Sequence, residues 1–230
     1  MTDTDPNPAP GIRRPWVVGI SGASGTPYAR SVLLGLLDAG CPVDLIVSRA
    51  ARLTILDETG LSWHDDAASL QAWLGREGDV RFWGPMDLAA GPSSGSYPAR
   101  GMVVVPASTA SVAGISQGLS KDLLQRAADV TLKERRPLVV VPRETPLGRS
   151  TLVHLLDLHD AGAVVLPASP GFYGAPQSVQ QLVDFVAGKV LDVLGVEHDL
   201  ARRWSGVLGG ARREAGNAVG GQTAPVVTAG

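Results

Sequence analysis

The chain has 230 residues, of which 44% are hydrophobic and 18% are charged. Its 20 Lys and Arg residues nearly balance 22 Asp and Glu residues, and the formal net charge of -2 argues against general nucleic-acid binding. A single cysteine, Cys41, excludes an internal disulfide framework and any metal site that needs several cysteines. No apolar run reaches the ~20 residues of a membrane span, and the first residues show no secretory signal, so we expect a cytoplasmic protein.

The two ends of the chain differ in composition from its middle. Residues 1–14 are rich in Pro, Asp and Thr, which predicts a disordered N-terminal tail. Residues 205–230 are dense in Gly and Ala without an apolar period, which predicts a flexible C-terminal tail. Residues 15–204 are expected to form a single domain.

Between the tails, continuous apolar runs alternate with segments of helical period. We expect strands at 16–21, 42–48, 101–106, 138–142 and 163–167. We expect helices at 26–39, near 49–58, 66–75, 109–118 and 121–135, and at 150–160 and 178–194. Strands that are apolar on every residue are typical of a parallel sheet covered on both faces. The pattern therefore predicts an α/β fold, a Rossmann-like doubly wound parallel sheet.

Small, hydroxylic or charged residues follow each predicted strand. These segments are 21–25, 48–49, 106–109, 142–145 and 167–170. Doubly wound sheets bind ligands beyond the carboxyl ends of their strands. We therefore expect the ligand site on this edge of the sheet.

The first of these segments, Gly19-Ile-Ser-Gly22-Ala-Ser-Gly25, joins a strand to a helix. Glycines let backbone amides approach an anion, and the helix N-terminus favours negative charge, so the loop suits a phosphate. It is neither a P-loop nor the dinucleotide GxGxxG motif, and Ser48-Arg49 lacks the carboxylate that would bind the ribose of NAD. The residues favour a single phosphate, as in FMN, over a loop whose glycines serve only a tight turn.

Charged residues suggest where a second anion would bind. Arg126, Asp129 and Lys133 share one helical face, which is either an anion-binding stripe or an ordinary solvated face. Arg143 and Glu144 follow a strand, where they could bind and protonate a phosphate or form a structural ion pair. The four histidines lack metal-ligand spacing, so we expect no metal.

Further candidates each have a plain structural alternative. The hydroxyls of segment 108–111 begin a helix, where N-capping alone would explain them. Tyr173 follows a strand end and could offer its hydroxyl to a ligand. Lys189 lies in the last helix, where a surface lysine is the ordinary interpretation, and Trp204 could serve only in packing.

Three stretches of the chain resemble the UbiX/Pad family of flavin prenyltransferases. They read GISGASGTPYA, VPASTASVAGISQGLSKDLLQRAADVTLKERRPLVVVPRETPL and GAVVLPASPGFYGAPQSVQQLVDFV, and the match runs from about residue 16 to 204. The resemblance implies transfer of the dimethylallyl group of dimethylallyl monophosphate to N5 and C6 of reduced FMN. The product, prenyl-FMN, would serve a partner decarboxylase of the UbiD type. The resemblance also implies a homododecamer, in which sites are completed between subunits.

By position, the resemblance assigns roles to individual residues. The FMN contacts it implies are Gly22, Ala23, Ser24, Ser48, Ser108, Thr109, Ala110, Ser111 and Arg143. The prenyl-phosphate contacts it implies are Arg126, Lys133, Glu144, Tyr173 and Lys189, with Trp204 and the flavin forming a π-rich wall. The catalytic residues it implies are Glu144 as the acid for the leaving phosphate and Ser24 with Glu58 as a proton relay.

The chain departs from the family pattern at two places. Ala107 stands where the family often has cysteine, which argues against a thiol at that turn, and Lys121-Asp122-Leu123 stands where it often has Asp-Asn-Leu.

Two other interpretations of the function remain. A flavin-dependent cysteine decarboxylase needs a histidine after the second strand and an Asn-Thr after Pro-Ala-Ser, and this chain has neither. A non-enzymatic FMN carrier, or a structural subunit of a decarboxylase complex, would keep the glycine loop and Arg143. It would have no reason to hold Glu58, Arg126, Lys133 and Glu144 together.

Overall fold

Six parallel strands form one sheet in the order β3-β2-β1-β4-β5-β6. The structure is a computed structural model that describes residues 13–172, 175–201 and 203. The strands are β1 (Trp16–Ile20), β2 (Val43–Val47), β3 (Val80–Trp83), β4 (Gly101–Ala107), β5 (Leu138–Pro142) and β6 (Val164–Val165). Every residue of β1, β2, β4 and β5 is buried, as expected for strands covered on both faces.

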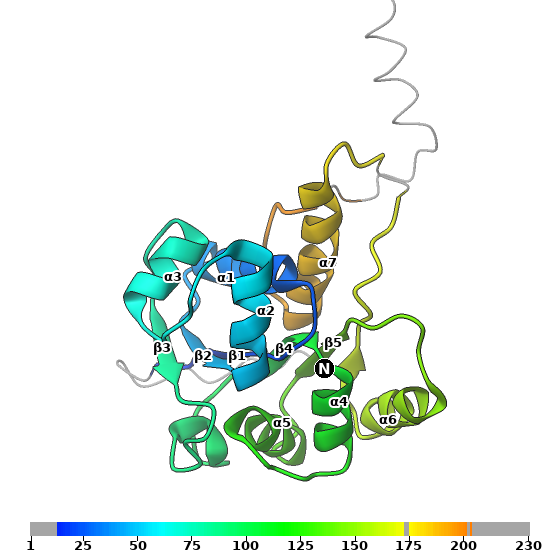
Figure 1. The fold of residues 1–230 in the computed structure, drawn as a ribbon. Coiled ribbons are helices and arrows are strands. Elements are labelled where there is room, and N and C mark those ends of the chain that lie inside the picture. Colours follow the sequence, from blue (N-terminus) through cyan, green and yellow to red (C-terminus); the bar gives the residue numbers. More distant parts are fainter. Residues whose placement is uncertain (1–12, 173–174, 202, 204–230) are drawn as a thin grey trace, which may run out of the picture.

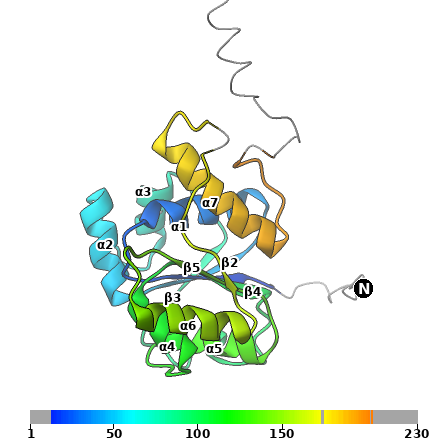
Figure 2. The ribbon, with the colours of Figure 1, turned by 90° about the vertical axis from the view of Figure 1, so that its right-hand side faces the viewer.

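Helices cover both faces of the sheet (Figures 1 and 2). Above it in Figure 1 lie α1 (Thr26–Asp38), α2 (Arg49–Thr59), α3 (Ala67–Leu74) and α7 (Val179–Leu194). Below it lie α4 (Thr109–Ser116), α5 (Leu123–Lys133) and α6 (Arg149–Asp160). A short 3-10 turn, Gly91–Ser93, lies between β3 and β4 and packs against α5. This is the predicted doubly wound α/β fold in a single domain.

The core has two halves, one on each face of the sheet. Val18 and Ile20 of β1 contribute to the cluster under α1 and α7, whereas Val17 contributes to the cluster over α4 and α5. Side chains of successive strand residues point to opposite faces, so one apolar strand supplies both clusters. The continuous apolar runs of the sequence follow from this geometry.

The edge strands depart most from the sequence prediction. The strand β3 was not expected, because it is only half-buried and includes the exposed Arg81. At the other edge, β6 covers Val164–Val165 where 163–167 was expected. An edge strand has a partner on one side only and needs no continuous apolar run, so its sequence signal is weak.

The predictions for the tails concern mostly residues outside the described ranges. Of the predicted N-terminal tail 1–14, residues 1–12 are not described, and Arg13 donates to the carboxylate of the buried Asp44 and to Val43 O at 2.7 Å. Residues 205–230 also lie outside, so the division of the chain into a domain and two tails stays a prediction. Among the described residues, no helix has the length and apolarity that crossing a membrane requires.

The connections of β1 place the functional edge of the sheet. The chain passes from β1 to β2 on one side and returns to β4 on the other, so the strand order changes direction between β1 and β4. In open α/β sheets such a switch point leaves a crevice outside the carboxyl ends of the strands, where ligands bind. The loop after β1 and the segment after β4 both lie at this switch point.

Candidate active site

The loop after β1 needs its glycines because its backbone lies close to α2 and to Tyr28. A side chain at Gly22 would collide with Cβ of Ala50 in the first turn of α2. Gly25 has φ +117°, a region that side-chain-bearing residues rarely adopt, and a Cβ there would lie 2.9 Å from the ring of Tyr28. The glycines therefore bring this loop against the N-terminus of α2 and set the start of α1.

Glu58 closes the same loop from the end of α2. Its Oε1 accepts a hydrogen bond from the Gly25 N–H at 2.8 Å. Its Oε2 accepts from the Thr26 N–H at 2.9 Å and from the Thr26 hydroxyl at 2.7 Å. The Ser24 side chain also hydrogen-bonds to this carboxylate. The two residues predicted to form a proton relay, Ser24 and Glu58, are therefore in direct contact.

The surroundings of Glu58 favour its ionised form. Burial acts to raise the pKa of this carboxyl, but the hydrogen bonds from Thr26, Ser24 and Gly25 outweigh it and hold the pKa below its ordinary value. The carboxylate also lies at the N-terminus of α1, where the helix dipole stabilises negative charge. Glu58 is therefore an anion at neutral pH, poised to accept a proton.

Ser21 ties the ends of β1 and β4 together. Its buried hydroxyl donates to Pro106 O at 2.9 Å and accepts the Ser108 N–H at 2.7 Å. The sequence analysis placed Ser21 in the segment 21–25 that follows the first predicted strand, but it gave this residue no role. Its position directly after β1 was the available signal.

The hydroxyls after β2 and β4 cap helices. Ser48 Oγ accepts the Ala51 N–H at 3.1 Å at the start of α2, and Ser108 Oγ accepts the Ser111 N–H at 3.3 Å at the start of α4. The capping interpretation is therefore confirmed for Ser108, and Ser48 makes a helix cap that the sequence analysis did not predict. Ser108, Thr109 and Ala110 are accessible, whereas Ser111 is buried. Their contacts with FMN stay a prediction.

Arg143 and Glu144 lie at the same edge of the sheet, directly after β5. The Arg143 N–H donates to Ala107 O at 3.3 Å, and a Cβ on Gly25 would lie 3.8 Å from Arg143 Cγ. The charge of Arg143 acts on Tyr28, whose pKa is nevertheless raised because burial disfavours the phenolate. Glu144 is exposed, and its carboxylate accepts a hydrogen bond from the N–H of the next residue, Thr145, at 2.9 Å. The Arg143 side chain thus lies beside the glycine loop, and Glu144 follows it directly in the chain.

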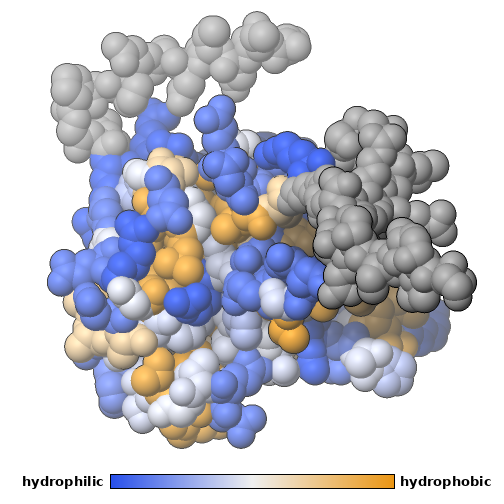
Figure 3. Space-filling model, turned by 90° about the horizontal axis from the view of Figure 1, so that it is seen from above, coloured by the Kyte–Doolittle hydropathy of each residue, from blue (hydrophilic) through white to orange (hydrophobic). Residues whose placement is uncertain are grey.

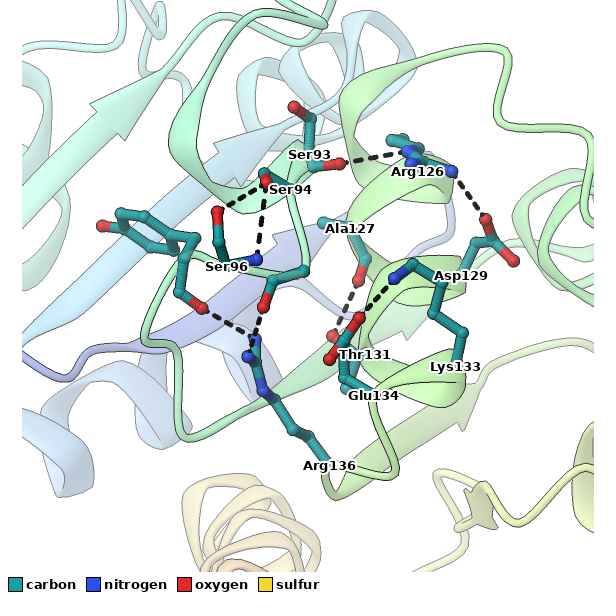
Figure 4. A network of polar contacts seen from close by, with 12 residues as sticks. Ser93, Ser94, Ser96, Arg126, Ala127, Asp129, Thr131, Lys133, Glu134 and Arg136 are labelled. Atoms are coloured by element: carbon teal, nitrogen blue, oxygen red, sulfur yellow. Dashed lines mark hydrogen bonds and ion pairs between the residues drawn. The ribbon is translucent and has the colours of Figure 1, made fainter.

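Arg126 and Lys133 lie on α5 (Figure 4), which covers the face of the sheet opposite to α1 and α2 (Figure 1). Arg126 Nε donates to Ser93 O at 3.1 Å, and its Nη1 pairs with Asp129 at 3.0 Å. Lys133 pairs with Glu134, and its side chain is 49% exposed. Both cations are thus partly solvated and paired. Within the described chain, the structure does not bring them to the glycine loop.

Lys189 also lies away from the strand ends. Residues early in α7 contact Ser31, and Leu191 packs at Gly35, so α7 runs parallel to α1 and carries Lys189 toward the opposite edge. Its Nζ pairs with Asp192 at 3.1 Å. Tyr173 and Trp204, the remaining predicted substrate contacts, lie outside the described residues.

The strand-end residues suit FMN. The N-termini of α1, α2 and α4 follow neighbouring strands, and helix N-termini bind phosphate through free N–H groups and the dipole. Accessible hydroxyls of Ser24, Ser48 and Ser108 and the guanidinium of Arg143 add donors for a phosphate and a ribityl chain. This donor set fits a mononucleotide better than a dinucleotide, as the sequence predicted.

Comparison with known proteins shows which family the chain belongs to. The family model named Flavoprotein matches residues 6–191. The chain is 63% identical over 212 residues to the flavin prenyltransferase UbiX of Streptomyces coelicolor, and the alignment covers 86% of this chain and 98% of that protein.

Two solved structures share the fold over nearly their whole length. AnUbiX (PadA1), crystallised with FMN and dimethylallyl pyrophosphate, is 37% identical with a TM-score of 0.76, covering 85% of this chain and 100% of its own. A dodecameric FMN-dependent UbiX-like decarboxylase from Escherichia coli O157:H7 is 39% identical with a TM-score of 0.75, covering 83% and 98%. Sequence, fold and strand-end chemistry agree: the chain belongs to the UbiX family of flavin prenyltransferases.

Proposed function

We propose that this protein joins the dimethylallyl group of dimethylallyl monophosphate to reduced FMN, forming an N5–C1 and a C6–C3 bond. The product, prenyl-FMN, is passed to a decarboxylase of the UbiD type. One observation carries the proposal beyond family membership. The Ser24–Glu58 pair, three helix N-termini and the Arg143-Glu144 pair all lie at one edge of the sheet.

The strand-end residues bind and orient the flavin. The loop at Gly22, Ala23 and Ser24, the segment 108–111 at the start of α4 and the guanidinium of Arg143 hold the FMN phosphate and ribityl chain. FMN, when bound, supplies the nucleophilic N5 and C6 atoms. Gly22 and Gly25 let the loop pack closely against α2 and Tyr28, because a side chain at either position would collide with Ala50 or with the Tyr28 ring.

The first chemical step is the departure of phosphate from the dimethylallyl group. The C1–O bond breaks with its electrons on the phosphate as the N5–C1 bond forms and N5 releases its proton to water, so the leaving group gains charge. Glu144 donates a proton to it, and the guanidinium of Arg143 stabilises the remaining charge. These side chains do work that a metal ion performs in other prenyl transfers.

Further cations reach the site from neighbouring subunits. Arg126, Lys133 and Lys189 lie away from the strand ends of their own chain, but all three are accessible to a second copy. We propose a homododecamer, as in the Escherichia coli relative, in which these groups, with Tyr173 and Trp204, complete a neighbour's prenyl-phosphate site. Apolar patches on the face shown in Figure 3 suit such association. Exposed leucines of α2 and α6 add to them, namely Leu53, Leu56, Leu152 and Leu156.

The second bond requires a proton to be added at prenyl C2 and another to be lost from C6. Ser24 is exposed at the loop and bonded to Glu58, so its hydroxyl can carry protons between the reacting atoms and the carboxylate. Glu58 is ionised at neutral pH, because its pKa is lowered, and its carboxylate can therefore accept the proton from C6. Ser24 and Glu58 therefore act in ring closure, whereas Glu144 acts in phosphate departure.

Phosphate release without metal tests this division of labour. Incubation with reduced FMN and dimethylallyl monophosphate in the presence of a chelator is expected to release inorganic phosphate at the full rate. The Glu144→Gln variant should bind FMN normally but release phosphate at least ~100-fold more slowly. A requirement for divalent metal, or normal release by Glu144→Gln, would contradict the proposal. We also propose a cytoplasmic location, on the sequence features alone.

A further inference from the structure

Thr26 makes two of the hydrogen bonds that hold Glu58. It is the first residue of α1 and is fully buried. Its N–H and its hydroxyl both donate to Oε2, at 2.9 Å and 2.7 Å. A carboxylate only accepts, so the hydroxyl must be the donor. Neither the sequence analysis nor the family resemblance gave this residue a role.

We propose that Thr26 is a positioning residue for ring closure: its buried hydroxyl fixes the carboxylate of Glu58 so that the remaining acceptor position faces Ser24. The inference rests on the proposed function, because it assigns Thr26 to the Ser24–Glu58 relay. Thr26 acts through Glu58 and is not itself placed against the flavin or the prenyl group.

The arrangement of donors supports a positioning role. Gly25 N–H holds Oε1 and Thr26 holds Oε2, so the carboxylate is gripped on both oxygens and cannot rotate freely. These donors belong to the backbone or to a buried side chain, and their positions are set by the start of α1. Ser24 is the exposed member of the group, and its hydroxyl is free to turn toward a reacting atom. Fixed donors on one side and a rotating donor on the other are what a proton relay needs.

Other charged groups near Glu58 either have partners elsewhere or are exposed to solvent. On α2 itself, Arg52 pairs with Asp65, and Asp57 and Arg49 are exposed. From α1, Arg30 donates to the carbonyl of Trp73 at 2.9 Å, and Tyr28 faces Arg143. Hydrogen bonds, rather than a paired cation, therefore set the charge state of Glu58 within the described residues, and the loss of the Thr26 hydroxyl would favour the protonated form.

The test compares Thr26→Val, which removes the hydroxyl at nearly constant volume, with Thr26→Ser, which restores it. Thr131→Val is the matched control, because Thr131 is also a buried threonine whose hydroxyl donates to a helix carbonyl, at 2.7 Å. Infrared titration of the Glu58 carboxyl, assigned with Glu58→Gln, measures its pKa without turnover. Anaerobic single-turnover experiments with reduced FMN and dimethylallyl monophosphate measure the two bonds separately, from about pH 4 to pH 8.

We expect Thr26→Val to raise the pKa of Glu58 and to slow formation of the second bond about tenfold. Formation of the N5–C1 bond should keep its rate, the acid limb of ring closure should move to higher pH, and Thr26→Ser should recover both properties. An unchanged Glu58 titration, or ring closure in Thr26→Val equal to that in Thr131→Val at every pH, would overturn the assignment. If wild-type protein makes no prenyl-FMN, the proposed function fails instead, and the infrared titration still decides whether Thr26 controls Glu58.

Discussion

The backbone N–H of Ser108 donates to the hydroxyl of Ser21 at 2.7 Å, across the switch point between β4 and β1. The same hydroxyl donates to Pro106 O at 2.9 Å, so a single buried side chain joins the two strand ends that form the crevice. The loop carrying Ser24 and the turn carrying the hydroxyls that we propose to bind FMN are thereby held in a fixed relation. Stability and flavin binding should therefore both depend on Ser21.

Replacing Ser21 with alanine leaves the Ser108 N–H and the Pro106 carbonyl without this partner. We expect Ser21→Ala to lower the free energy of unfolding by about 1–3 kcal/mol, measured in urea, because buried polar groups lose a hydrogen bond. FMN affinity should fall about tenfold in a fluorescence titration. The control is Ser31→Ala, which removes a buried hydroxyl bonded to Asp184 between α1 and α7. If both variants bind FMN equally well, the hydrogen bonds of the Ser21 hydroxyl do not shape the FMN site.

The depressed pKa of Glu58 makes stability depend on pH. A carboxyl whose pKa is lower in the folded than in the unfolded state stabilises the fold above its unfolded pKa. That stabilisation is lost as the pH falls through the folded value, below the ordinary 4.5. Wild type should therefore exceed Glu58→Gln in free energy of unfolding at pH 7, and the gap should shrink in acid. Urea unfolding of both proteins across this range measures the gap, and a gap that widens in acid would contradict the assigned shift.

Much of this fold could be predicted because its central strands are buried on both faces. The apolar runs at β1, β2, β4 and β5 are strong signals, and glycines or capping residues mark the helix ends. The edge strand β3 was missed because half-burial leaves room for Arg81. Periodicity reports burial, and at the edges of a sheet burial is incomplete.

The site was predictable in position more than in its contacts. Parallel strands place their carboxyl ends on one edge, so the sequence indicated where Ser24, Ser108 and Arg143 would meet. The bond between Thr26 and Glu58 joins residues 32 apart along the chain. Nothing in local spacing encodes such a contact, because it depends on how α1 and α2 pack. For the same reason, the helical face of Arg126 and Lys133 was foreseen, but the layer that carries it was not.

Gly25 offers a test of backbone geometry in the glycine loop after β1. Alanine there must adopt φ +117° and would place Cβ 2.9 Å from the Tyr28 ring, so Gly25→Ala should destabilise the protein by about 2 kcal/mol or more. It should also abolish tight FMN binding. The control is Gly40→Ala, where φ is +66° and no atom lies within 4 Å of the added Cβ. Calorimetry should show a smaller loss of stability for Gly40→Ala than for Gly25→Ala, and Gly40→Ala should still bind FMN. If the two variants bind FMN with equal affinity, the backbone conformation at Gly25 does not shape the FMN site.

Subunit mixing tests whether Arg126 and Lys133 serve a neighbour's site. We expect the double variant Arg126→Ala/Lys133→Ala and the variant Glu58→Gln each to be inactive as pure oligomers. Co-assembled in equal amounts, they should recover about a quarter of the wild-type rate of prenyl-FMN formation, because a quarter of the sites then combine intact loops with intact cations from another chain. The same two proteins, purified separately and combined without subunit exchange, provide the baseline. Mixed oligomers that stay at this baseline would show that the cations act within their own chain or not at all.

The measurement that tests the proposed reaction most directly is the mass of the flavin after anaerobic incubation of the protein with reduced FMN and dimethylallyl monophosphate. The account predicts that FMN gains one dimethylallyl unit, that inorganic phosphate appears in equal amount, and that a chelator changes neither. Recovery of FMN at its original mass, with dimethylallyl monophosphate intact in the presence of active wild-type protein, would contradict it.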